Sequence, residues 1–122
     1  MKPRWIAIVG RKGGVGKTAL ALGLAAHYSR AGRRVLLVDL DPQGSTSLAL
    51  GADATGEHLA AMLAGTAAPD VVQPAENLGL VPGGPALETL TAPRPLRDAL
   101  AGLEADLVLM DCPPGHADLV PG

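Results

Sequence analysis

Short apolar runs recur along the chain, and each has the length of a β-strand. The segments that predict strands are residues 5–9, 35–38, 78–81 and 106–110, the last of which begins with Asp106 before four apolar residues. Unbroken apolar runs of this length, without alternating polar positions, are typical of parallel strands that are buried on both faces. The pattern therefore predicts a sheet that is covered by helices on both sides.

Helical patterns separate these runs. Residues 16–31 are rich in helix formers, with Leu20, Leu24 and Tyr28 on one face and Gly32 well placed to end the helix. A strand, a helix and a strand within 40 residues form a βαβ unit, which predicts a parallel sheet with a right-handed crossover. Shorter helices are predicted at residues 48–50, 57–63, 86–90 and 94–103, and an irregular segment with two prolines at 67–77.

Composition and charge narrow the function classes. The chain has no Phe, one Trp and one Tyr, and its net charge of -2 argues against a basic nucleic-acid binder. However, eight of its ten Lys and Arg residues lie at or before Arg34, and no Asp or Glu precedes Asp39. The amino-terminal third is therefore suited to meet negative charge.

Cysteine content and hydropathy predict the compartment. Cys112 is the single cysteine, which excludes an internal disulfide and fits a reducing environment. No apolar stretch reaches the ~20 residues that a membrane-spanning helix needs. We therefore expect a soluble, cytoplasmic protein that makes no membrane contact.

The stretch GRKGGVGKTAL, residues 10–20, is the strongest candidate for chemistry. Glycines between a strand and a helix let backbone N–H groups and the positive helix end surround an anion. Lys17 would then reach the β and γ phosphates of a nucleotide, and Thr18 would offer its hydroxyl to Mg²⁺. The alternative is a glycine-rich turn with solvated lysines.

The strict GxxxxGK[ST] pattern is not met, because its first glycine falls on Arg11. The segment KGGVGKT instead resembles the loop of the ParA/MinD family of deviant Walker P-loop ATPases. This resemblance implies that Lys12 reaches across a homodimer interface to the ATP of the partner subunit, so that Lys12 and Lys17 are both catalytic. The nucleotide-binding positions that it implies are Lys12, Gly13, Gly14, Val15, Gly16, Lys17, Thr18 and Ala19.

Two acidic strand ends strengthen the resemblance. VLLVDLDPQGSTS, residues 35–47, is similar to the family's D-x-D-P-Q-G motif, which implies that Asp41 orients the attacking water and Asp39 supports the magnesium shell. The alternative is a turn capped by Asp. DLVLMDCPPG, residues 106–115, resembles the Walker B strand, which implies that Asp111 holds magnesium through water. Cys112 is expected to pack, and the three histidines, which lack metal-ligand spacing, are expected on the surface.

The resemblance implies a fold and limits the function. We expect an α/β P-loop NTPase-type parallel sheet flanked by helices, in one partial domain over residues 1–122 that is truncated after the Walker B strand. The family's adenine-binding segments, its basic segment for nonspecific DNA contact and its membrane-binding amphipathic helix have no counterpart in this sequence. A sheet truncated there would leave an open edge.

Three functional hypotheses follow. The first is a dimeric ATPase switch of the ParA type, with ATP and Mg²⁺ as cofactors, that acts in plasmid or chromosome partitioning or in cargo positioning. The second is a non-hydrolysing remnant that binds nucleotide and pairs with a full-length relative. A GTPase or small-molecule kinase ranks below both, because the sequence has no NKxD-like guanine signature.

Overall fold

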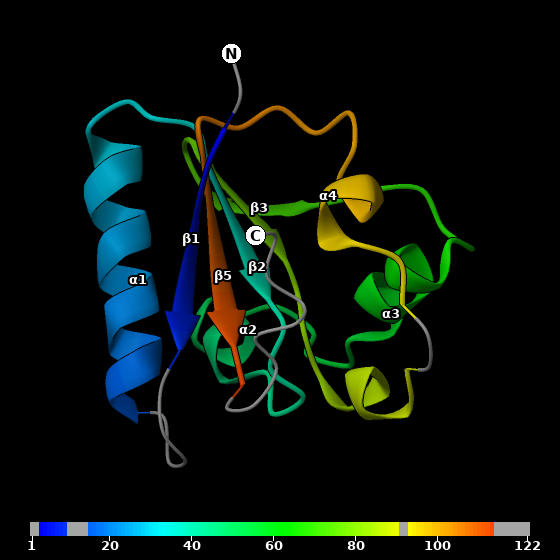
Figure 1. The fold of residues 1–122 in the computed structure, drawn as a ribbon. Helices are drawn as coiled ribbons and strands as arrows, with labels where there is room; N and C mark the ends of the chain where they lie inside the picture. The colour runs from blue at the N-terminus through cyan, green and yellow to red at the C-terminus, as the bar shows by residue number, and fades with distance from the viewer. Residues whose placement is uncertain (1–2, 10–14, 91–92, 114–122) are drawn as a thin grey trace.

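The structure has the predicted α/β fold, and its strands form one mixed sheet (Figure 1). The structure, a computed structural model, describes residues 3–9, 15–90 and 93–113. Within these ranges the strands are β1 (Arg4–Val9), β2 (Val35–Asp39), β3 (Val72–Ala75), β4 (Leu78–Val81) and β5 (Leu107–Cys112). Their spatial order is β1-β5-β2-β4-β3, in which β3 alone is antiparallel to its neighbour.

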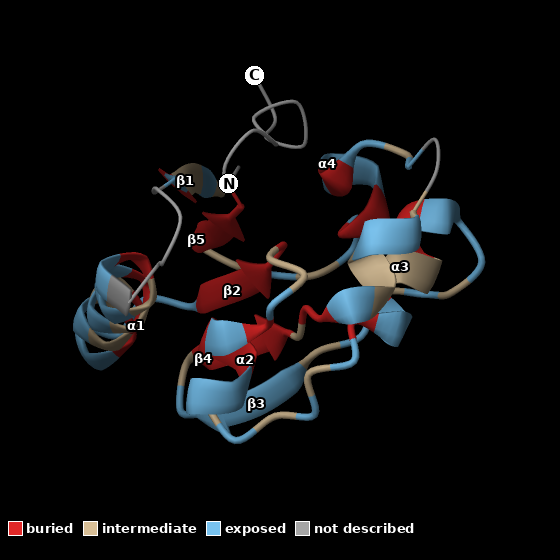
Figure 2. Cartoon of the chain, turned by 90° about the horizontal axis from the view of Figure 1, so that it is seen from below, coloured by how far each residue is buried: buried red, intermediate tan, exposed pale blue. Residues whose placement is uncertain are grey.

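The helices lie on both faces of this sheet (Figure 2). They are α1 (Val15–Arg30), α2 (Ser45–Ala49), α3 (Glu57–Ala64) and α4 (Leu96–Ala99), with a 3₁₀ turn at Pro85–Thr89. Alternating side chains of the central strands pack into two separate apolar clusters, one on each face of the sheet. Leu37 and Leu109 belong to the cluster that contains residues of α1, whereas Val38 and Met110 belong to the one with residues of α3 and α4.

Two predicted elements differ from the structure. Residues 67–77 were expected to be irregular, but β3 forms there, and all four of its residues are exposed. An exposed edge strand needs no apolar run and tolerates Pro74, so its sequence carries little strand signal. The helix predicted at residues 94–103 is reduced to the four residues of α4, which begins after Pro95.

The packing face of α1 also differs from the prediction. Leu20, Leu24 and Tyr28 were expected to form one apolar face, but Leu20 is 53% exposed, whereas Ala21 and Ala25 are fully buried. Leu24 and Tyr28 are half-buried and pack at the margin of the same cluster. The small alanine side chains let the helix approach the sheet closely, which the Leu spacing alone does not reveal.

The carboxyl ends of β2 and β5 bring acidic residues together. Asp39 and Asp111 are paired in register on these neighbouring parallel strands. The glycine-rich turn after β4 closes against the same edge, since a Cβ on Gly83 would collide with the backbone oxygen of Asp39. Only glycine allows this contact. No helix in the described part of the chain is long and apolar enough to cross a membrane.

Candidate nucleotide-binding site

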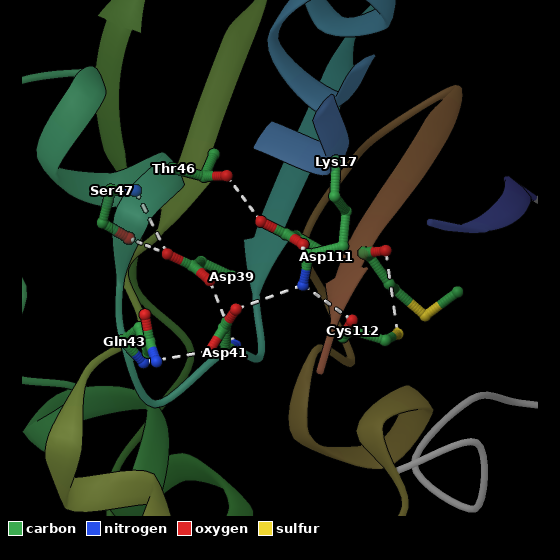
Figure 3. Close-up of polar contacts among 9 residues, drawn as sticks. Lys17, Asp39, Asp41, Gln43, Thr46, Ser47, Asp111 and Cys112 are labelled. Carbon is green, nitrogen blue, oxygen red and sulfur yellow. Dashed lines mark hydrogen bonds and ion pairs between the residues drawn. The ribbon is translucent and has the colours of Figure 1, made fainter. Parts of the chain in front are cut away.

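Lys17, in the first turn of α1, points at the carboxyl ends of β2 and β5 (Figure 3). Its ammonium nitrogen lies 2.9 Å from Asp111 Oδ1 and 3.1 Å from Asp41 Oδ2. It also donates a hydrogen bond of 2.9 Å to the carbonyl oxygen of Cys112. One buried cation therefore joins three points at the same edge of the sheet.

The charge balance keeps Lys17 protonated. Burial by itself lowers the pKa of the Lys17 ammonium, but the carboxylates of Asp111 and Asp41 outweigh this effect and raise it above its ordinary value. The side chain of Lys17 is 5% exposed and that of Asp111 is 1% exposed. Lys17 is thus a fixed positive charge at the position where the sequence predicts phosphate binding.

Asp39 is fully buried, and described neighbours already bond both of its carboxylate oxygens. Oδ2 accepts hydrogen bonds from the backbone N–H and the hydroxyl of Ser47, at 3.1 and 2.6 Å, and Oδ1 accepts one from the backbone N–H of Asp41 at 3.1 Å. Burial raises the pKa of the Asp39 carboxyl, although these hydrogen bonds oppose the shift. The bonds tie the start of the DPQG segment to α2, and the predicted magnesium role of Asp39 stays a prediction.

Asp111 has one carboxylate oxygen in a hydrogen bond and one without. The hydroxyl of Thr46, on α2, donates to Oδ2. Oδ1 forms the ion pair with Lys17 but has no well-aligned hydrogen bond from the residues that the structure describes. A buried carboxylate oxygen with spare acceptor capacity fits Mg²⁺, which prefers oxygen ligands and keeps several waters.

Asp41 is held from two sides and keeps some contact with solvent. Its Oδ1 accepts a hydrogen bond of 2.9 Å from the backbone N–H of Gln43, while Oδ2 pairs with Lys17. Its side chain is 17% exposed. A fixed carboxylate beside a cation and open to water has the properties required to orient a nucleophilic water.

Other predicted residues lie on α1 or outside the described ranges. Thr18 is half-buried, and Gly16 and Ala19 are exposed. Val15 begins the helix, but its side chain is not described. The positions outside the described residues are Lys12, Gly13 and Gly14.

Thr46 and Ser47 are the site residues that the sequence analysis missed. Both are fully buried, and they bond the acidic residues at the ends of β5 and β2 respectively. The run Ser-Thr-Ser directly after Gly44 was visible in the sequence. Hydroxyls at a helix start are common, however, and nothing in the pattern indicates which carboxylate they reach.

Cys112 and the histidines lie as predicted where they are described. Cys112 is fully buried, and burial raises the pKa of its thiol to about 11. His27 and His58 are exposed, and His58 contacts the backbone oxygen of Ala68. His116 lies outside the described residues. Among the residues that could be searched, His, Cys, Asp and Glu form no cluster suited to holding a metal by themselves.

A strand, a glycine-rich connection and a helix whose first turn carries a buried lysine, facing acidic strand ends, define a P-loop nucleotide-binding fold. Residues 6–107 match the family described as the CobQ/CobB/MinD/ParA nucleotide binding domain. The chain belongs to this family.

Individual relatives agree with this assignment. The chain is 44% identical over 123 residues to the chromosome-partitioning ATPase Soj of Thermus thermophilus, a match that covers 97% of this chain and 49% of the relative. The chain spans about half the length of the curated relatives it matches.

Solved structures show the same fold. The cobyrinic acid a,c-diamide synthase of Mycobacterium smegmatis, with a bound ATP analog and magnesium, matches with a TM-score of 0.79 and 36% identity, over 93% of this chain and 52% of that one. The septum site-determining protein MinD of Pyrococcus horikoshii, complexed with Mg-ADP, matches with a TM-score of 0.76 and 35% identity, over 93% and 50%.

Proposed function

We propose that this chain forms the phosphate-binding and magnesium-binding part of a ParA-type ATPase, a nucleotide-dependent switch in plasmid or chromosome partitioning or cargo positioning. The observation that carries the proposal is the convergence of Lys17, Asp41 and Asp111 at one edge of the sheet. Relatives that are chromosome-partitioning ATPases support the biological role.

Lys17, Asp41 and Asp111 each have a role in this proposed reaction. Lys17 binds the β and γ phosphates of ATP and offsets the charge that develops on the transferred phosphoryl group. Asp41 accepts a hydrogen bond from the attacking water and orients it toward the γ phosphate. Asp111, with Thr18, would hold magnesium, which when bound supplies charge neutralisation at the phosphate oxygens.

The glycine loop and Lys12 complete the proposal. Backbone N–H groups of residues 13–16 would surround the phosphates, together with the amino-terminal end of α1. Lys12 would reach the nucleotide of a second copy, so turnover would require a homodimer. These roles rest on the sequence resemblance, as does the expected cytoplasmic location.

A second function uses the same phosphate-binding residues, because binding of a nucleotide does not by itself require turnover. In this alternative the chain binds nucleotide without turning it over and acts by pairing with a full-length relative. Binding and turnover therefore have to be measured separately.

The test compares nucleotide binding with phosphate release. A fluorescent ATP analogue titrated with Mg²⁺ reports binding, and inorganic phosphate release reports turnover. Lys17→Ala is expected to weaken binding at least 10-fold, whereas Asp41→Ala should keep binding and abolish turnover. The matched controls are Arg30→Ala, an exposed cation at the other end of α1, and Asp53→Ala, an exposed acid outside the site.

The outcomes separate the two functions. Turnover that Lys17→Ala and Asp41→Ala remove, with both controls active, supports the ATPase. Binding that depends on Lys17 without any turnover supports the non-hydrolysing alternative. Binding that Lys17→Ala leaves unchanged contradicts both.

A further inference from the structure

Helix α2 carries two adjacent buried hydroxyls that bond the ends of two adjacent strands (Figure 3). Ser47 bonds Asp39 at the end of β2, and Thr46 bonds Asp111 at the end of β5. Because Asp39 and Asp111 are in register on neighbouring strands, one short helix reaches both. The two pairs nevertheless differ in what they leave available.

The two carboxylates differ in how many of their oxygens can still accept a hydrogen bond or bind a ligand. Both oxygens of Asp39 accept hydrogen bonds from the chain itself. Asp111 has only Oδ2 bonded in this way, and its Oδ1 faces Lys17 without an aligned hydrogen bond among the described groups. The Ser47 contact therefore completes a closed structural unit, whereas the Thr46 contact acts on a carboxylate that still has an open position.

The Thr46 hydroxyl sets which way that open position points. A carboxylate can rotate about its terminal torsion, which has a broad energy profile. The bond from Thr46 to Oδ2 fixes the plane of the Asp111 carboxylate, so that Oδ1 faces the ammonium group of Lys17. Groups that hold a metal-binding carboxylate in place commonly control metal affinity.

We propose that Thr46 is a positioning residue for Asp111: its hydroxyl aims Oδ1, the oxygen that pairs with Lys17, at the magnesium-nucleotide site and links that site to α2. The proposal rests on the proposed function, because it assumes that Asp111 serves a magnesium-bound nucleotide.

The position of α2 links the Asp111 carboxylate to the segment that carries Asp41. The helix begins at Ser45, four residues after Asp41, and the backbone N–H of Gly44 donates to the carbonyl oxygen of Asp41. A movement of the segment that carries Asp41 would therefore move Thr46, and with it the orientation of Asp111. The Thr46 hydroxyl therefore couples magnesium binding to the place of Asp41, in addition to the contacts that Lys17 makes with both Asp41 and Asp111.

The experiment separates magnesium binding from nucleotide binding. Affinity for a fluorescent ATP analogue is measured with Mg²⁺ and with EDTA for the wild type, Thr46→Val and Thr46→Ser. Thr46→Val keeps the shape and removes the donor, and it is expected to raise the Mg²⁺ concentration for half-maximal binding about 10-fold while leaving the EDTA affinity unchanged within about 2-fold. Thr46→Ser restores the donor and should return the Mg²⁺ dependence to within about 3-fold of the wild type.

Thr66→Val provides the matched control, since it makes the same atomic change at an exposed threonine that bonds only the backbone oxygen of Ala61 among described groups. A Thr46→Val protein with wild-type Mg²⁺ dependence overturns the proposal. A variant that loses affinity equally with Mg²⁺ and with EDTA overturns it as well, because that result indicates a general structural effect.

A nucleotide-free measurement distinguishes failure of the inference from failure of the proposed function. If the wild type binds no nucleotide, or if Thr46→Val does not fold, NMR of the wild-type protein still tests the contact through the deuterium isotope shift at Thr46 Cβ. A slowly exchanging Thr46 hydroxyl supports the positioning role, and a rapidly exchanging one overturns it. Absent nucleotide binding in the wild type contradicts the proposed function alone.

Discussion

Lys17 Nζ lies 2.9 Å from Asp111 Oδ1, and both side chains are almost fully buried. The pair joins the first turn of α1 to the end of β5, elements that are far apart in the chain. Because a buried charge without a partner is costly, the ion pair makes the proposed phosphate site part of the stability of the fold.

Removal of Lys17 should destabilise the nucleotide-free protein. Lys17→Met leaves the Asp111 carboxylate without its cation, and we expect a loss of about 3 kcal/mol in the free energy of unfolding. In an Asp111→Asn background the same change should cost at least ~1 kcal/mol less, because only the part-exposed carboxylate of Asp41 then loses its cation. Urea unfolding of the two single variants and the double variant measures this coupling, and strictly additive effects would show that the pair is not formed.

Ser47→Ala should destabilise the folded protein more than the same change at Ser45 on the same helix. Ser47→Ala removes the donor to Asp39 and the acceptor for the backbone N–H of Gly83, which lies 3.0 Å from the hydroxyl. Two buried polar groups lose a partner, and we expect a cost of about 2 kcal/mol. Ser45→Ala, at an exposed position of α2, should change stability by less than about 0.5 kcal/mol. Thermal or urea unfolding compares them, and equal effects would contradict the described contacts.

Cys112 should be unreactive in the folded protein. Because its thiol is buried and its pKa is raised to about 11, little thiolate exists near pH 8. Iodoacetamide labelling at pH 8 should be at least 10-fold slower in the native protein than in urea. The folded pKa lies above the ordinary value of 9.0, so the stability linked to the protonated thiol should be intact below about pH 9 and lost as the pH rises through about 11. Equal labelling of folded and unfolded protein at pH 8 would argue that the thiol is accessible.

The strands of the sheet centre could be predicted because burial on both faces requires an apolar run. Residues 35–38 and 78–81 carry that signal, and β2 and β4 follow it closely. By contrast, β3 is exposed along its whole length, so no apolar run in its sequence indicates that it pairs with β4. The apolar face predicted from Leu20, Leu24 and Tyr28 failed at Leu20 for a related reason, because helical spacing identifies a face but not how closely it packs.

The acidic part of the site was predictable from topology. Carboxyl ends of parallel strands meet at one edge, and a lysine at the start of the intervening helix faces that edge, so the meeting of Lys17, Asp41 and Asp111 follows from the order of elements. The hydroxyl contacts of Thr46 and Ser47 depend instead on the tilt of a five-residue helix, which no local pattern specifies. The roles predicted for Lys12, Gly13 and Gly14 stay predictions.

The side-by-side placement of Asp39 and Asp111 also bears on how the sheet finds its correct alignment. A slip of β5 against β2 by one residue would turn a carboxylate toward the apolar cluster under α3 and α4, where Val38 and Met110 now pack. Mispaired sheets are therefore penalised by ion desolvation as well as by lost packing. Asp39 and Asp111 would thus also act during folding, by selecting one alignment of the two central strands.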